Sequence, residues 1–174
     1  IRLPGGLLAL WLAWLAVAQA RYIGVNFLLS ILVLVWVADI FAYFAGRAFG
    51  GRFSPGKLAP SISPGKSWEG VWGGMAGVVI LAFVWVWADR SLDAGVASFY
   101  TRLARHGGFL LLIAVLFMAA MSVVGDLVES LIKRSAGVKD SSGLLPGHGG
   151  VLDRVDALLP TLPLAMMLVT LGGL

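Results

Sequence analysis

The sequence predicts an all-α integral membrane protein, because it is strongly apolar, its apolar residues form long segments, and its charges lie between them. Of its 174 residues, 59% are hydrophobic and 13% charged, and the mean hydropathy is +0.92. A soluble domain carries about 25% charged residues, so much of this surface is expected to face lipid. A single transmembrane catalytic domain over residues 1–174 accounts for the chain. Because the sequence begins at Ile1, we expect further helices upstream.

Five segments approach or reach the roughly 20 apolar residues that a bilayer-spanning helix needs. They are residues 5–20, 22–45, 69–88, 108–128 and 155–174. The first is short and is separated from the second by Arg21 and Tyr22 alone, which predicts a tight helical hairpin with a tilted first span. The 89–107 stretch mixes charged and apolar residues, and its spacing predicts a short helix in the membrane interface.

The distribution of basic residues predicts the topology. The 46–68 and 129–154 loops together carry eight Lys and Arg residues, against four on the opposite side. Two spans separate these loops, so they share one face, and the positive-inside rule makes it cytoplasmic. The same rule explains the net charge of +4. No basic tract is interleaved with aromatic residues, so no nucleic-acid partner is expected, and the absence of cysteine excludes thiolate metal sites.

The segment Ser130–Asp156 contains four cations, three carboxylates and a histidine between two predicted spans. Its glycines allow backbone N–H groups to approach a phosphate closely. Asp153 and Asp156, three residues apart at a helix start, are expected on one face, where they can hold a divalent ion. The simpler alternative is a connecting loop whose cations are membrane anchors and whose Asp153 caps a helix.

Two acids fall inside apolar segments, where an ionised side chain is costly. Asp126 belongs to a polar face that continues through Glu129 to Lys133, and we expect it to face a cavity, a cation or a partner. Glu129 and Lys133 are also spaced for an ordinary ion pair along a helix. For Asp39, a metal ligand, a partner for a cation and a structural hydrogen bond are equally compatible with the sequence.

The end of the 46–68 loop, Ser63-Pro64-Gly65-Lys66-Ser67, predicts a turn that leads into the third span. Ser67 is a candidate N-cap, and a helix N-terminus preceded by Gly-Lys favours phosphate binding. The spacing is not that of a P-loop, and no strand is expected before it.

At these residues the chain resembles the phosphatidate cytidylyltransferase (CDP-diacylglycerol synthase) family, chiefly its C-terminal catalytic half. The family signature runs from a serine through Lys-Arg, Lys-Asp and His-Gly-Gly to Asp-Arg-x-Asp, and the segment from Ser130 to Asp156 matches every position. The resemblance extends to the 125–130 and 63–70 segments and to Asp39 with Ala42-Tyr43 and Gly46-Arg47. Ile40 departs from it, because a small or hydroxylated residue is expected after the acid.

The resemblance implies that phosphatidate attacks the α-phosphorus of CTP and releases pyrophosphate. Both reactants are anions, so catalysis depends on cations. The implied Mg²⁺ ligands are Asp126 and Asp153, supported by Asp156 or Glu129, with a second cation, monovalent or divalent, also allowed. The implied substrate-binding residues are Ser63, Lys66, Lys133, Arg134, Lys139, Asp140, Arg154 and Asp39, with Gly149 and Gly150 around a phosphate and His148 at a phosphate or the cytosine.

The resemblance also implies a homodimer in a bacterial inner membrane. Three other functions stay open on the sequence. A related membrane enzyme can use CTP with an isoprenoid lipid as acceptor. A small ion transporter can use Asp39 and Asp126 as an ion path, although it needs no glycine-rich loop. A purely structural subunit is the third.

Overall fold

The computed structural model describes residues 2–54, 56–138, 141–142, 150 and 152–173. Within these residues the chain is mainly helical, and a small antiparallel hairpin interrupts the helices. The helices are α1 (Arg2–Ile23), α2 (Val25–Phe49), α3 (Trp68–Ser91), α4 (Phe99–Arg105), α5 (Gly108–Ser135), α6 (Leu152–Val155) and α7 (Leu158–Leu171); the strands are β1 (Lys57–Ala59) and β2 (Ser63–Ser67).

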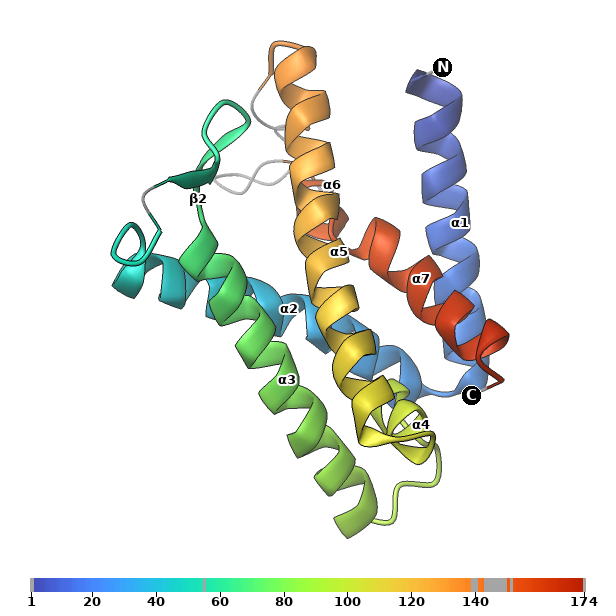
Figure 1. Ribbon diagram of the computed structural model, residues 1–174. Coiled ribbons are helices and arrows are strands. Elements are labelled where there is room, and N and C mark those ends of the chain that lie inside the picture. Colours follow the sequence, from blue (N-terminus) through green and yellow to red (C-terminus); the bar gives the residue numbers. More distant parts are fainter. Residues whose placement is uncertain (1, 55, 139–140, 143–149, 151, 174) are drawn as a thin grey trace.

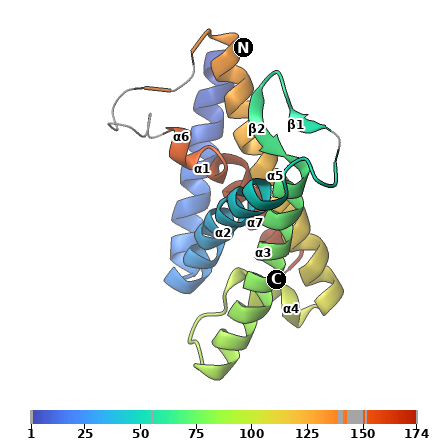
Figure 2. The same cartoon turned by 90° about the vertical axis from the view of Figure 1, so that its left-hand side faces the viewer.

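The long helices form a bundle in which α2 crosses obliquely between two helix pairs (Figure 1). α1 packs against α7, and α3 packs against both α2 and α5. The β1–β2 hairpin lies near the end of α5, and α4 lies at the opposite end of the bundle (Figures 1 and 2). The 46–68 and 129–138 segments therefore approach the same end of the molecule, as the sequence predicts.

In the part of the chain that the structure describes, four helices are long and apolar enough to cross a membrane by length and composition: α1 from Pro4 onward, α2, α3 and α5. The all-α membrane class is thereby confirmed. The fifth expected span, residues 155–174, contains the 14-residue helix α7. At about 1.5 Å per residue, α7 is shorter than the roughly 30 Å hydrocarbon layer. The helix is short because α6 ends at Val155 and α7 begins only at Leu158, so the first residues of the 155–174 segment form a turn.

The helical hairpin expected at the start of the chain is present. α1 ends at Ile23 and α2 begins at Val25, so Gly24 alone joins them. Its φ of 151° lies in a region that favours glycine, and a Cβ there would lie 2.8 Å from Val96 Cγ1. The direct reversal therefore depends on the absence of a side chain at this position.

The closest helix contact, between α2 and α3, also depends on glycines. A Cβ on Gly73 would lie 2.1 Å from Ala45 Cβ, and one on Gly74 would lie 2.9 Å from the Ala38 carbonyl oxygen. Small residues let helix backbones approach closely inside membranes, where packing drives association. These glycines explain why α2 and α3 pack together along so much of their length.

The expected short helix after the third span is α4, and its apolar residues point into the bundle. Phe99, Tyr100 and Leu103 are fully buried. Tyr100 Oη donates to the Ser30 carbonyl oxygen in α2 at 2.9 Å, and Thr101 Oγ1 donates to Asp89 Oδ2 in α3 at 2.6 Å. Hydrogen bonds and buried apolar surface thus attach α4 to two spans.

Candidate active site

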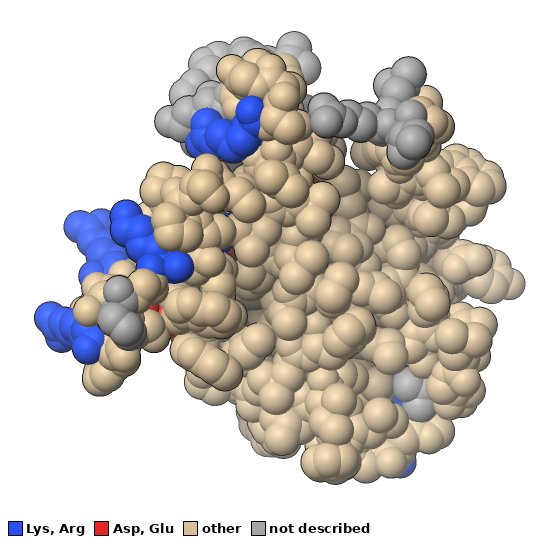
Figure 3. Space-filling model, turned by 45° about the horizontal axis from the view of Figure 1, so that its top comes forward, with Lys and Arg blue, Asp and Glu red and all other residues tan. Residues whose placement is uncertain are grey.

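Lys and Arg side chains gather at the hairpin side of the molecule and at the end of α5, while most of the remaining face is uncharged (Figure 3). The cations of these two regions are Arg47, Arg52, Lys57 and Lys66 near the hairpin, with Lys133 and Arg134 on α5. This is also the end of the bundle at which the acids of α5 and α6 lie.

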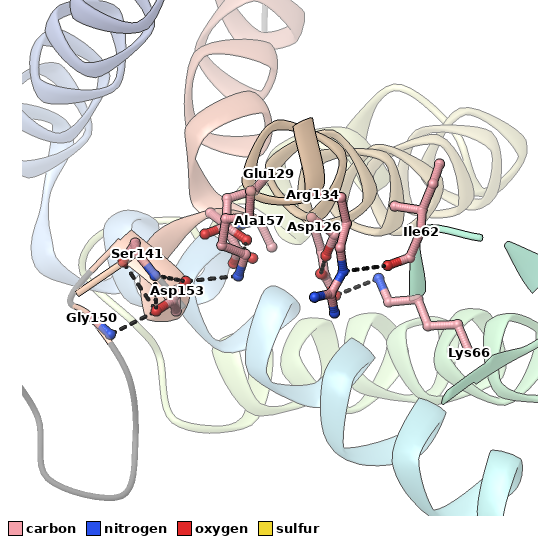
Figure 4. Close-up of polar contacts among 12 residues, drawn as sticks. Ile62, Lys66, Asp126, Glu129, Arg134, Ser141, Gly150, Asp153 and Ala157 are labelled. Atoms are coloured by element: carbon pink, nitrogen blue, oxygen red, sulfur yellow. Dashed lines mark hydrogen bonds and ion pairs between the residues drawn. The ribbon is translucent and has the colours of Figure 1, made fainter. Parts of the chain in front are cut away.

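An ion pair between Lys66 Nζ and Asp126 Oδ2 connects β2 to α5. A second contact, from Arg134 Nε to the Ile62 carbonyl oxygen at 3.4 Å, joins the same two regions. Both contacts are visible in Figure 4. The prediction that the two motif-bearing loops share one face is therefore confirmed, and Lys66 is the cation expected to face Asp126, whose side chain is half-buried.

Asp126 also lines a cavity of about 450 Å³ between α2, α3, α5 and β2. Polar groups stand at one part of its wall, where Lys66 and Asp39 join Asp126. The remaining wall is made mostly of small or apolar residues, including Ala42, Gly74 and Val123. Its lining therefore suits a ligand with a charged group and an apolar part.

Asp39 makes no hydrogen bond or ion pair with the described residues. This reduces the three roles that the sequence allows for it, which were metal ligand, partner of a cation and structural hydrogen bond. It lies close enough to Lys66, Asp126 and Asp156 for their charges to act on it. A structural hydrogen bond to another helix is not seen at this position. What the geometry leaves is a carboxylate that faces the cavity.

Lys133 holds a second cluster of polar groups beside the first. Its Nζ lies 2.7 Å from Glu129 Oε2 and 2.7 Å from Asp153 Oδ1. Asp153 Oδ2 accepts hydrogen bonds from the backbone N–H of Gly150 at 2.6 Å and of Ser141 at 3.0 Å. The expected Glu129–Lys133 pair is thus present, and Lys133 additionally connects α5 to α6.

The surroundings of Asp153 keep it ionised. Burial acts to raise its pKa, but the hydrogen bonds from Lys133 and from the Gly150 backbone outweigh that effect, and the pKa lies well below its ordinary value. The Gly150 N–H donates to this carboxylate, so in this arrangement it is not available to a phosphate. Its expected role in cradling a phosphate stays a prediction.

The sequence predicted that Asp153 and Asp156 lie on one helix face, and this is wrong. Asp156 follows α6, which ends at Val155, so the two residues do not share a continuous helix. Its Oδ1 accepts the Ala157 N–H at 2.7 Å. Burial raises the pKa of Asp156; the Ala157 hydrogen bond opposes this, and the Asp126 carboxylate adds to it. Asp156 therefore lies within electrostatic range of the cavity acids.

The acids of this region are of the type that binds divalent cations, and in this arrangement Asp126, Glu129 and Asp153 are paired with lysines. Glu129 is buried, with 7% of its surface exposed, and its Oε1 has no hydrogen-bond partner among the described residues. Carboxylate oxygens are the ligands that Mg²⁺ prefers, and an unpaired buried carboxylate oxygen is costly without a cation. Within the described residues, no three acids or histidines already form a metal-binding group.

Several expected site residues lie outside the described residues, namely Lys139, Asp140, His148 and Gly149, and the side chain of Arg154 is not described either. Ser63 begins β2 and is not among the lining residues of the cavity, although Gly65, Lys66 and Ser67 are. The N-cap predicted at Ser67 is confirmed, since its Oγ accepts the Gly70 N–H at 3.2 Å.

Two cavity residues were missed by the sequence reasoning. Tyr43 and Arg47 line the cavity on α2, and Arg47 Nη1 donates to Tyr43 Oη at 3.0 Å. A signal for them was available, because Asp39, Tyr43 and Arg47 follow one another at intervals of four and therefore share a helix face. The sequence places Arg47 two turns beyond Asp39 on the same helix, and the family resemblance includes Tyr43 and Arg47, but neither residue was given a role in the site.

Comparison with known proteins gives one consistent result. A family model described as "Cytidylyltransferase family" matches residues 5–171. Proteins named phosphatidate cytidylyltransferase are 44% identical over 174 residues in Pseudomonas aeruginosa, covering 99% of this chain and 58% of that protein, and 49% identical over 142 residues in Haemophilus influenzae, covering 82% and 45%. A further one from Thermotoga maritima is 44% identical over 138 residues, covering 79% and 46%. The chain thus spans about half the length of the curated relatives it matches.

Proposed function

Since this multi-pass membrane protein belongs to the cytidylyltransferase family, we propose that it is the catalytic region of a phosphatidate cytidylyltransferase. Its reaction is the conversion of CTP and phosphatidate to CDP-diacylglycerol and pyrophosphate, a step of phospholipid biosynthesis. The observation that carries the proposal is the ion pair between Lys66 and Asp126. It brings the two charged loops together at a cavity whose remaining wall is mostly small or apolar.

This combination suits a reaction between a nucleotide and a lipid. The apolar part of the wall, which includes Ala38 and Ala42 on α2 and Met75 on α3, is compatible with a lipid whose chains remain in the bilayer. Lys66 and Lys133 lie at the same end, each paired with carboxylates in this arrangement. An ion path needs the intramembrane acids but has no use for so many cations beside them, which disfavours a transporter.

In the reaction, a phosphatidate phosphate oxygen attacks the α-phosphorus of CTP. The bond from that phosphorus to the bridging oxygen of the β-phosphate breaks, and pyrophosphate leaves with the electron pair. The attacking phosphate is already anionic, so no protein base is required. The residues of this chain instead reduce the repulsion between the two anions, with Lys66, Lys133 and Arg134 as the phosphate-binding groups.

A divalent cation, proposed to be Mg²⁺, would be held by Asp126 and Asp153 with support from Glu129 and Asp156. When bound, it supplies the charge that stabilises the reacting phosphate oxygens. In the structure, Lys66 forms an ion pair with the Asp126 carboxylate, and Lys133 forms one with the Asp153 carboxylate. We therefore expect both lysines to exchange these carboxylates for substrate phosphates during the catalytic cycle.

The proposal places this end of the bundle at the cytoplasmic face, where CTP is available, and the count of basic residues supports that orientation. The protein is proposed to act as a homodimer in the bacterial inner membrane. His148, Lys139, Asp140, Gly149 and Arg154 are proposed to complete the nucleotide site.

The test uses the full-length protein in detergent micelles with labelled CTP, Mg²⁺ and phosphatidate. We expect labelled CDP-diacylglycerol and pyrophosphate in equal amounts. Asp153→Asn should lower kcat/KM by about 10²-fold or more, as expected when one preorganised electrostatic group is removed. Arg105→Gln, a matched change of charge at the opposite end, should leave turnover unchanged.

Other results would contradict the proposal in identifiable ways. Turnover only with a polyprenol or an isoprenoid phosphate as acceptor would retain the chemistry and replace the lipid. Ion flux in proteoliposomes without pyrophosphate release would favour a transporter. Nucleotide chemistry that is unchanged in Asp153→Asn and Lys133→Ala would indicate a structural subunit.

A further inference from the structure

Arg47 is a cation of the cavity wall for which the proposed function gives no role. It lies in the last turn of α2. Among the described residues it has no carboxylate partner, and its guanidinium is oriented by Tyr43, which accepts one N–H at 3.0 Å. Its other N–H donors remain available for a ligand, in the planar arrangement that matches a phosphate.

Exposed aromatic side chains lie on the end of α2 that carries Arg47 and on the start of α3, as is typical of the headgroup layer of a membrane. Tyr43 and Phe44 precede it on α2, and Trp68 and Trp72 lie on the first turns of α3. Tryptophan and tyrosine prefer the membrane–water interface. The end of α2 and the start of α3 are adjacent, because a Cβ on Gly46 would lie 3.2 Å from Ser67 Oγ.

The cavity continues from Arg47 into the apolar part of the bundle. On α2 the lining residues beyond Arg47 are Gly46, Tyr43, Ala42, Asp39 and Ala38. Of these Gly46, Ala42 and Ala38 are small, and α5 contributes Ala119. A ligand whose anionic group contacts Arg47 can therefore extend an apolar portion along this wall. A nucleotide, which is polar at both ends, has no use for that part.

We propose that Arg47, oriented by Tyr43, binds the phosphate of the lipid acceptor at the mouth of the cavity and so selects a lipid phosphomonoester. This inference rests on the proposed function, and it assigns the binding of the lipid substrate to residues of α2. The Lys133–Asp153 cluster is left for the nucleotide. A neutral lipid with a hydroxyl in place of the phosphate offers the guanidinium no charge, and binding it leaves Arg47 unpaired.

The test compares KM values for the two substrates in the full-length protein. Hydrogen bonds to charged groups contribute about 1.5–3 kcal/mol, so Arg47→Gln should raise KM for dioctanoyl phosphatidate about ten- to hundredfold and leave KM for CTP within about twofold. Arg47→Lys should recover part of the loss, because it restores the charge without the planar donors. Tyr43→Phe, which removes only the orienting hydroxyl, should raise the lipid KM about two- to tenfold.

Arg52→Gln is the matched control, because Arg52 is an exposed cation near the end of α2 that does not line the cavity. It should leave both KM values unchanged. Binding measured without turnover provides an independent readout. Dioctanoyl phosphatidate should raise the melting temperature of the wild type but not of Arg47→Gln, and dioctanoylglycerol should raise neither.

Two results would overturn the inference: an effect of Arg47→Gln on KM for CTP instead of the lipid, or unchanged lipid binding and lipid KM in that variant. Either result leaves the proposed function intact as long as the wild type forms CDP-diacylglycerol. If the wild type forms none but still binds dioctanoyl phosphatidate through Arg47, the lipid site stands and the proposed reaction fails.

Discussion

At the scale of single residues, Lys133 is important because its one ammonium group pairs with two carboxylates, which lie on different helices. Glu129 and Asp153 each lie 2.7 Å from its Nζ. Glu129 is more deeply buried than Lys133 (side-chain exposure 8% against 17%). Loss of the cation would therefore leave a buried acid without compensation, which costs more than the pair itself contributes.

We expect Lys133→Met to lower the free energy of unfolding by about 2–3 kcal/mol, below the range for fully buried pairs because Lys133 keeps some contact with solvent. Thermal melting of the full-length protein in detergent measures this change. Arg134→Gln, the neighbouring exposed cation, should shift the melting temperature little. An equal shift in both variants would mean that Lys133 matters only for the net charge of this end.

Sequence reasoning at this scale works where a residue type has few acceptable environments. Asp126 required a cation or cavity and has both, and Ser67 caps α3 as its position before the span predicted. It fails for partners that depend on packing. Nothing in the sequence brings Ser141 to Asp153, since that contact depends on how the two segments are placed in space.

At the scale of elements, the α2–α3 contact determines the geometry of the cavity wall. Gly73 and Gly74 face the backbone of α2 across distances that admit no side chain. The sequence shows these glycines but not which helix they face. The β1–β2 hairpin was likewise missed, because Ser63–Ser67 contains proline and glycine and lacks the alternating pattern of a strand.

Gly73→Ala should separate α2 from α3, since the added methyl group would lie 2.1 Å from Ala45 Cβ. Overpacking of this kind costs about 1–3 kcal/mol, and melting in detergent should show the loss. Gly6→Ala is the matched control: its Cβ meets nothing within 4 Å, and alanine favours the helix. Equal stability of Gly73→Ala and the wild type would mean that this contact tolerates a wider spacing.

At the scale of the whole molecule, charge divides the bundle into two ends, and the fold confirms that division without assigning either end to a compartment. The sequence could predict it because basic residues near spans follow the positive-inside rule. It could not predict that the last apolar segment is shorter than a span, because apolar counting does not detect the turn between Val155 and Leu158.

The orientation is testable by labelling, because the chain contains no cysteine. Single cysteines at the exposed positions Ser61 and Ser135 should be protected from an impermeant maleimide in intact cells and should react after the cells are opened. A cysteine at the exposed position Ser91 should react in intact cells. The reverse pattern would place the charged end outside and remove CTP access from the proposal.

The cavity wall formed by Ala38, Ala42, Gly70 and Gly74 has an evolutionary consequence. These positions already hold the two smallest side chains, so almost every substitution there reduces the space available and almost none enlarges it. Variation at this wall is therefore one-directional: descendants can become more selective for slender ligands far more easily than they can become more permissive. Widening the cavity would require the helices themselves to move, which a single substitution rarely achieves.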